Sequence, residues 1–374
     1  MIKFPDRAVW FSFAIHTILV SISYLLSVKL PVNNVQLPFI NDELTTLTPI
    51  MDALIRWDAH WYTFIAQNGY DMRSIVFFPL LIYMVKIPTY LGFSYAASGL
   101  IVCNLFAFLS FWIMHTTLKL DFNEREVNFA LISYAVIPTS FFLNSIYTEP
   151  IFLFFSLLCV YFSRTEQWWF AGISGALATL TRNIGVCLFL LLIYEFYRKN
   201  PYNRNSFFKI LPLSFPPIAL ICFSAYNFVL VGDPLAFVHS QQEWGRRFGV
   251  PWENFVRNLP HTFSPDLYIQ PGATLDTFMV TLCFIALCYL TIFQKTISVP
   301  TCYLIIGWLW FLIPLTSTAP WLPLYSMSRF ALVIFPIYIF IGKLPKSLFY
   351  LFITISAVIM TLCTALFFNW FWVG

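Results

Sequence analysis

Stretches of apolar residues long enough to cross a lipid bilayer recur from one end of this chain to the other. A transmembrane helix needs about 20 mostly apolar residues to cross about 30 Å of hydrocarbon. Hydrophobic residues make up 59% of the 374 residues and charged residues only 10%, which excludes a soluble protein with a polar surface. In lipid, backbone N–H and C=O groups must find their hydrogen-bond partners within the protein. The sequence therefore predicts an all-α, polytopic membrane protein with one integral-membrane domain over residues 1–374.

About eleven transmembrane helices are predicted, within a range of 10 to 13. The stretches are 8–30, 97–118, 127–143, 146–163, 168–181, 184–197, 211–231, 275–293, 299–316, 329–341 and 347–370. The first lacks a small-residue cleavage site and is interpreted as a retained span rather than a signal peptide. The apolar piece 77–91 is interrupted by Pro79, Lys86 and Pro88. It is predicted to be an in-plane or re-entrant helix on the outer side.

The lysine and arginine residues of the short loops predict the orientation in the membrane. The loop 198–209 carries four basic residues and no acid, so it is placed in the cytoplasm. Alternation of the spans then puts the two long polar segments, 31–76 and 232–274, on the extracytoplasmic side, where interfacial helices are expected. The membrane is expected to be the plasma membrane in a prokaryote or the endoplasmic reticulum in a eukaryote, with the outer face lumenal in the second case.

Charge and cysteine usage exclude several other classes of protein. The formal net charge of +4 is small for this length and predicts no nucleic-acid partner. All eight cysteines fall in apolar stretches without metal-type spacing, so neither disulfides nor zinc are expected. A divalent cation is compatible with the outer acids Asp42, Glu43, Asp52 and Asp71, but their spacing matches no calcium or magnesium loop. No metal site and no required cofactor are predicted.

The outer segment 31–76 contains "RWDAHWYTFIAQNGY" at residues 56–70. Asp58 precedes a plausible short helix ending near Gly69, so its carboxylate either caps the helix N-terminus or meets a lipid headgroup. Both interpretations remain open from the residues alone. Trp57, Trp61 and Ile65 share one helical face, which fits a helix lying in the headgroup belt.

Three charged residues lie between apolar stretches that leave little room for a polar loop. Glu149 in "NSIYTEP" is expected at or just below the interface, where acids are costly and often functional; the alternative is a helix start capped by Thr148. Arg182 in "TRNIG" and Arg329 in "SMSRF" face the same side. Each guanidinium either snorkels to the surface or grips a phosphate through two hydrogen bonds.

The second outer segment opens with "GDPLAFVHSQQEWGRRFG" at residues 232–249. Its aromatic and amide side chains, Gln242 and Trp244 among them, suit stacking on and hydrogen bonding to a sugar or a lipid headgroup. An amphipathic surface helix anchored by Trp244 explains the pattern equally well.

Taken together, these stretches resemble the PIG-V-like mannosyltransferases, which belong to the multispanning GT-C class and include an enzyme of glycosylphosphatidylinositol anchor synthesis. The resembling stretches are "RWDAHWYTFIAQNGY", "FFPL", "NSIYTEP", "LATLTRNIG", "GDPLAFVHSQQEW", "SMSRFALVIFPIY" and "ALFFNWFWVG". They run nearly end to end in the family's order. The chain departs from the pattern at Asn183 and Ser328, where the family commonly has proline, and it is short for the eukaryotic anchor enzyme.

The resemblance implies transfer of mannose, with inversion, from polyprenyl- or dolichyl-phosphate mannose to a lipid-linked or glycan acceptor on the extracytoplasmic face. By match to the family's tryptophan-aspartate motif, Asp58 is expected to be the general base. Arg182 and Arg329 are expected to bind the donor phosphate, without an obligatory cation. The expected substrate-binding residues are Arg56, Trp57, Trp61, Tyr62, Glu149, Gln242 and Trp244.

Two other functions remain as alternatives. A transporter or flippase for a lipid-linked sugar would favour acids or prolines breaking spans near the midplane and often an internal repeat, and neither pattern is visible in the sequence. A non-catalytic membrane subunit that stabilises a partner enzyme would make Asp58 replaceable. An accessory membrane subunit is compatible with the enzyme as well.

Overall fold

The computed structural model describes residues 4–35, 47–200, 210–266 and 269–374. Asp42, Glu43 and most of the basic loop 198–209 lie outside the described residues. The described chain is 72% helical, with 17 α-helices, which confirms the all-α prediction. Five helical segments within it are long and apolar enough to cross a bilayer, and they indicate a multi-pass membrane protein. They are α1 (Arg7–Ser27), α5 (Tyr95–Leu118), Leu211–Val231 containing α11 (Phe215–Val231), α14 (Gln270–Ile292) and α18 (Lys346–Phe368).

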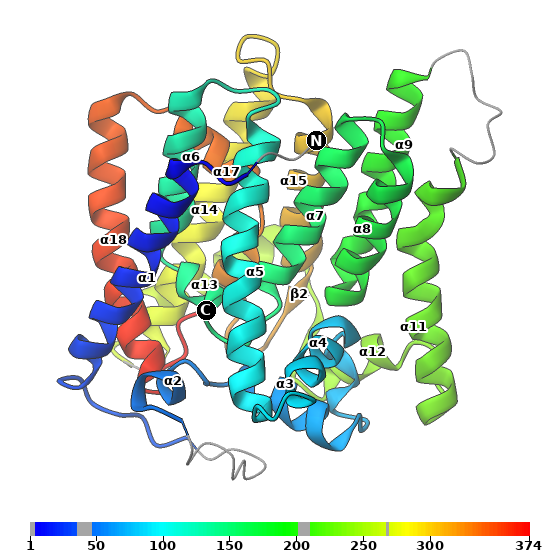
Figure 1. The fold of residues 1–374 in the computed structure, drawn as a ribbon. Helices are drawn as coiled ribbons and strands as arrows, with labels where there is room; N and C mark the ends of the chain where they lie inside the picture. The colour runs from blue at the N-terminus through cyan, green and yellow to red at the C-terminus, as the bar shows by residue number, and fades with distance from the viewer. Residues whose placement is uncertain (1–3, 36–46, 201–209, 267–268) are drawn as a thin grey trace.

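The other six predicted stretches each contain a shorter helix. These are α6 (Glu124–Val136), α7 (Glu149–Arg164), α8 (Trp168–Thr181), α9 (Leu188–Lys199), α15 (Thr301–Leu315) and α17 (Pro336–Gly342). α1 packs beside α18 at one edge of the molecule, and α11 lies at the opposite edge (Figure 1). α7 lies between them and is buried along most of its length.

Two of the predicted stretches are interrupted by proline. The stretch 127–143 breaks after Val136, and a 3-10 turn (Ser140–Leu143) follows Pro138, because proline has no N–H group to continue the helix. In the last turn of α6, the Ala135 carbonyl accepts a hydrogen bond from the Ser140 hydroxyl at 3.0 Å and lies 2.9 Å from His16 Nδ1. Irregular backbone of this kind is tolerated in a membrane protein where it is buried inside the protein, as it is here.

A similar break precedes α17. The stretch 329–341 divides into α16 (Met327–Ala331) and α17, and Pro336 is the first residue of the second helix. Proline is favoured at that position because the first helical N–H groups have no intrahelical partner. The break leaves α16 as a short helix that carries Arg329.

Short helices gather at the end of the molecule away from the start of α1 (Figure 1). They include α2 (Pro49–Ala53), α3 (Asp58–Asn68), α4 (Pro79–Thr89) and α12 (Ala236–His239). The eleven residues of α4 make a helix about 16 Å long, too short to cross about 30 Å of hydrocarbon. A ribbon of β1 (Arg247–Phe248) and β2 (Ser317–Thr318) joins two segments distant in sequence, with Arg247 opposite Thr318.

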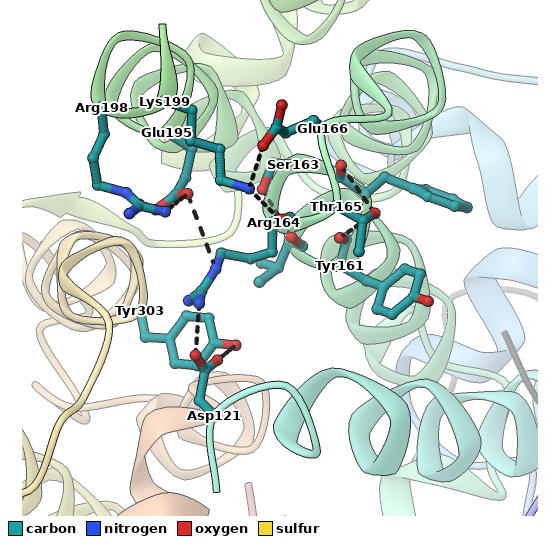
Figure 2. Close-up of polar contacts among 12 residues, drawn as sticks. Asp121, Tyr161, Ser163, Arg164, Thr165, Glu166, Glu195, Arg198, Lys199 and Tyr303 are labelled. Carbon is teal, nitrogen blue, oxygen red and sulfur yellow. Dashed lines mark hydrogen bonds and ion pairs between the residues drawn. The ribbon is translucent and has the colours of Figure 1, made fainter. Parts of the chain in front are cut away.

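The opposite end of α7 carries a network of ion pairs (Figure 2). Arg164, the last residue of α7, lies 2.6 Å from Asp121, which also accepts a hydrogen bond from the Tyr303 hydroxyl at 2.7 Å. Glu195 pairs with Arg198 at 2.7 Å. The network connects α7, α9 and α15, and it lies a full helix length from Glu149 at the other end of α7.

Candidate active site

A cavity of about 630 Å³ lies where α3, α12, α16 and the β1–β2 ribbon meet. Six of the residues singled out from the sequence line it: Asp58, Tyr62, Arg182, Gln242, Trp244 and Arg329. They come from the two long polar segments, 31–76 and 232–274, and from two of the short interruptions between apolar stretches. The fold therefore brings together residues that are up to 271 positions apart in the chain.

Asp58 and Arg329 form an ion pair at the surface of this cavity. The Arg329 Nη1 atom donates to the Asp58 Oδ2 atom at 2.5 Å. Asp58 is the first residue of α3, and Trp57 holds the N-cap position without a side-chain capping bond. The capping interpretation of Asp58 is therefore wrong, because its carboxylate bonds Arg329. Trp57 has φ +55°, a strained value for a bulky residue of the kind found at functional sites.

Glu149 lies behind the cavity and connects the two arginines. Its Oε1 atom accepts a hydrogen bond from Arg182 Nη1 at 2.7 Å and lies 3.0 Å from Arg329 Nε. Glu149 is fully buried, and its Oε2 atom has no hydrogen-bond partner among the described residues. The alternative cap at Thr148 makes no side-chain hydrogen bond. Both guanidinium groups turn inward to acids, which argues against simple snorkelling.

Local backbone features aim these two arginines at Glu149. α8 ends at Thr181, and Arg182 is extended before a 3-10 turn (Asn183–Cys187), in which Gly185 donates its N–H to the Arg182 carbonyl at 2.9 Å. At the start of α16, the buried Asp276 accepts the Ser328 N–H at 2.7 Å. Asp276 sits inside an apolar stretch with no motif around it, so the sequence does not predict this contact.

Arg246 is a third guanidinium on the cavity wall. Its central guanidinium carbon lies 5.3 Å from the centroid of the Tyr325 ring and 5.6 Å from that of Phe330, and Nη1 lies 3.5 Å from the Ser317 hydroxyl. Burial lowers the pKa of Arg246 from its ordinary value, as expected in a poorly solvated wall. Its position depends on the β1–β2 pairing, which no local sequence pattern predicts.

Four of the seven expected substrate-binding residues do not line the cavity: Glu149, which lies behind it, and Arg56, Trp57 and Trp61. Arg56 donates to the backbone carbonyls of Phe368 and Ile55 at 2.9 and 2.8 Å, and so fixes the start of α3 to the end of α18. Trp61 packs against neighbouring rings, and Trp57 packs on the aromatic C-terminal tail. The predicted headgroup face of Trp57, Trp61 and Ile65 is wrong, because Ile65 is fully buried.

The segment 232–249 does not form the amphipathic helix that was one interpretation of its pattern. It folds into α12, a single 3-10 turn and the strand β1. The Trp244 indole N–H donates to the Arg73 carbonyl at 3.1 Å, and its ring packs on Trp61. Trp244 therefore joins the segment 232–274 to the segment 31–76.

α3 carries one carboxylate and one histidine that are candidates for a base. His60 is fully buried, and burial together with the nearby Arg56 guanidinium lowers its pKa to about 4, so its ring is neutral at pH 7. Of these two side chains, Asp58 lines the cavity and His60 does not. Among the described residues, no cluster of three histidine, cysteine, aspartate or glutamate side chains is arranged to hold a metal ion.

The arrangement can bind an anion and accept a proton from a neighbouring hydroxyl. Guanidinium groups on the wall suit phosphate, and a carboxylate at the cavity surface suits general-base chemistry. Comparison of the chain with protein-family models, with curated proteins and with solved structures finds no match.

Proposed function

We propose that the protein is an inverting glycosyltransferase of the PIG-V-like type, with about eleven transmembrane helices. It moves mannose from polyprenyl- or dolichyl-phosphate mannose to a lipid-linked or glycan acceptor on the extracytoplasmic face. The observation that carries the proposal is the position of Asp58 at the surface of a 630 Å³ cavity, beside arginine side chains. Pockets that bind small molecules have volumes of about 300–1,000 Å³, and this cavity falls within that range.

The proposed reaction is a single displacement at the anomeric carbon of mannose. Asp58 takes the proton of the acceptor hydroxyl while that oxygen forms a bond to the anomeric carbon. The bond from this carbon to the phosphate oxygen breaks, and the lipid phosphate leaves with the electron pair. Guanidinium groups stabilise the negative charge that grows on the departing phosphate. No cofactor is required for these steps.

The rim of the cavity supports a substrate with a lipid chain. Val238, Phe248 and Ile313 line the cavity and are exposed by 48%, 84% and 41%. Exposed apolar side chains next to a polar cavity are expected to face hydrocarbon in a multi-pass protein. A polyprenyl chain can therefore remain in the bilayer beside these residues while its phosphate and sugar enter the cavity.

The first test is transfer of labelled mannose from synthetic polyprenyl-phosphate mannose by purified protein, with membrane lipid and glycan extract as acceptor. Asp58→Asn is expected to fold normally and to lose about 10²- to 10⁴-fold in turnover, the usual contribution of a general base. Asp71→Asn is the matched control, because Asp71 lies in the same outer segment and caps Ser74.

The remaining outcomes separate the proposal from its alternatives. Full activity in Asp58→Asn at equal expression contradicts the assignment of the base. Donor binding without product, even with added extract, favours a non-catalytic subunit. Absence of donor binding in a folded sample favours a transporter of another substrate.

A further inference from the structure

The charges around the cavity are not equally available to a ligand. Asp58, Arg329, Glu149 and Arg182 form a continuous row in which each acid contacts an arginine at 3.0 Å or less. Two positive and two negative charges in this row neutralise each other. An incoming anion must compete with a carboxylate for Arg182 or for Arg329, and a buried acid left unpaired is costly.

Arg246 is different from the other two arginines. Within the described part of the chain, no carboxylate lies within 4 Å of its guanidinium, although Asp58 and Asp276 attract it from farther away. Among the described residues, the Arg246 side chain makes one hydrogen bond, the long contact with Ser317. An arginine carries five N–H donors, so most donors of Arg246 remain for a ligand.

The three guanidinium groups nevertheless converge on one place. Their central carbon atoms lie 4.8 Å (Arg182), 5.4 Å (Arg329) and 5.6 Å (Arg246) from the centroid of the Phe330 ring. The Tyr325 and Phe330 rings hold the Arg246 guanidinium by cation–π contacts, which leave its N–H groups as donors for a phosphate. Of these three arginines, Arg246 is the one whose positive charge is not balanced by an acid in contact with it among the described residues.

We infer that Arg246 is the principal binding residue for the phosphate of an isoprenoid phosphate ligand, and that Arg182 and Arg329 position Glu149 and Asp58. This inference rests on the proposed function for the identity of the ligand. It reassigns the donor-phosphate role that the sequence suggested for Arg182 and Arg329, because the structure shows those two side chains already bonded to acids.

The test measures binding of farnesyl phosphate to the purified full-length protein, with farnesol as the uncharged comparison. Arg246→Ala is expected to weaken farnesyl phosphate binding about tenfold or more, since a hydrogen-bonded charge pair is lost. Farnesol binding is expected to remain unchanged. Arg246→Lys is expected to recover part of the affinity, because lysine keeps the charge without the planar fork.

Arg257→Ala is the matched control, because Arg257 is an exposed arginine of the same segment, 232–274, that pairs with Glu253 and does not line the cavity. It is expected to change the affinity less than threefold. Thermal melting of each variant checks that the protein is folded. Equal farnesyl phosphate affinity in Arg246→Ala and wild type, or failure of the wild type to prefer the phosphate over the alcohol, overturns the inference.

The same variants separate this inference from the proposed function. If the wild type binds farnesyl phosphate through Arg246 but transfers no mannose, the anion site stands and the transferase proposal fails. If mannose is transferred and Arg246→Ala leaves the KM for the donor unchanged, the transferase proposal stands and the role of Arg246 is wrong.

Discussion

At the scale of single residues, the buried Glu149 is the centre of the charge row. Glu149→Gln leaves Arg182 and Arg329 facing a neutral amide, and removal of one partner from a buried ion pair costs about 3–5 kcal/mol. We therefore expect a clearly lower melting temperature in detergent. The double variant Glu149→Gln with Arg182→Gln is expected to lose less melting temperature than the sum of the losses in the two single variants. Strict additivity of the two losses would contradict the coupling between these side chains.

Asp276 gives a second prediction at this scale. Asp276→Ala removes the acceptor of the Ser328 N–H, and a buried donor without a partner costs about 1–3 kcal/mol. Because this bond holds the start of α16, kcat is expected to fall with the displacement of Arg329. Asp276→Asn keeps an acceptor oxygen and is expected to recover most of the stability and turnover. Equal loss in both variants would show that the charge of Asp276, not its hydrogen bond, is what matters.

At the scale of elements, α13 (Pro251–Thr262) buries polar side chains and exposes apolar ones, the reverse of a surface helix in a soluble protein. Asn254 and Asn258 are buried and bond neighbouring groups, the first through the Leu315 carbonyl at 2.8 Å. The opposite, exposed side carries an apolar stripe at helical spacing: Trp252, Val256, Leu259 and Phe263. A helix with amides inside and apolar groups outside is expected to lie against lipid at the membrane interface.

Spin labels test the position of α13 in reconstituted vesicles. A nitroxide at Val256 is expected to be accessible to oxygen and shielded from a water-soluble nickel reagent. A label at the neighbouring Arg257, which pairs with Glu253 away from the stripe, is expected to show the reverse. Similar aqueous accessibility at both positions would place α13 in solvent.

Gly185 couples the turn after α8 to the placement of Arg182. A Cβ atom at Gly185 would lie 2.6 Å from backbone atoms of Ala178 and Thr179, so Gly185→Ala must push the turn away from α8. We expect lower stability and a loss of turnover, measured by thermal melting and mannose transfer. Gly99→Ala is the control, because the three atoms nearest to its Cβ belong to the Ile146 side chain, and a smaller effect on turnover is expected.

The sequence predicts helices well and long-range pairings poorly. Apolar composition is sufficient to place a helix in every predicted stretch, and chain-breaking prolines such as Pro138 explain where two of them divide. Arg56 and Arg182 look alike in sequence, but only the tertiary contacts show that Arg56 bonds backbone carbonyls while Arg182 lines the cavity. Arg246 depends on the pairing of residues 247 and 318, and local periodicity contains no information on such a contact.

At the scale of the whole molecule, α7 relates the two ends of the protein. Its first residue, Glu149, belongs to the cavity, and its last, Arg164, belongs to the ion-pair network of Figure 2. The two clusters must therefore lie toward opposite faces if α7 crosses the membrane. The basic residues Arg198 and Lys199 belong to the network end, which the positive-inside rule places in the cytoplasm.

Cysteine labelling tests this orientation in intact cells or sealed vesicles. A cysteine replacing Glu243, close to the cavity, is expected to react with a membrane-impermeant maleimide from outside. A cysteine replacing the exposed Gln167, next to the network, is expected to react only after permeabilisation. Labelling of the wild-type protein measures the background from its native cysteines, of which Cys222 is exposed on α11. The reverse labelling pattern would place the cavity on the cytoplasmic side, where sugar nucleotides are available. A lipid-phosphate donor would then lose its support, although the geometry of Asp58 and Arg246 would be unchanged.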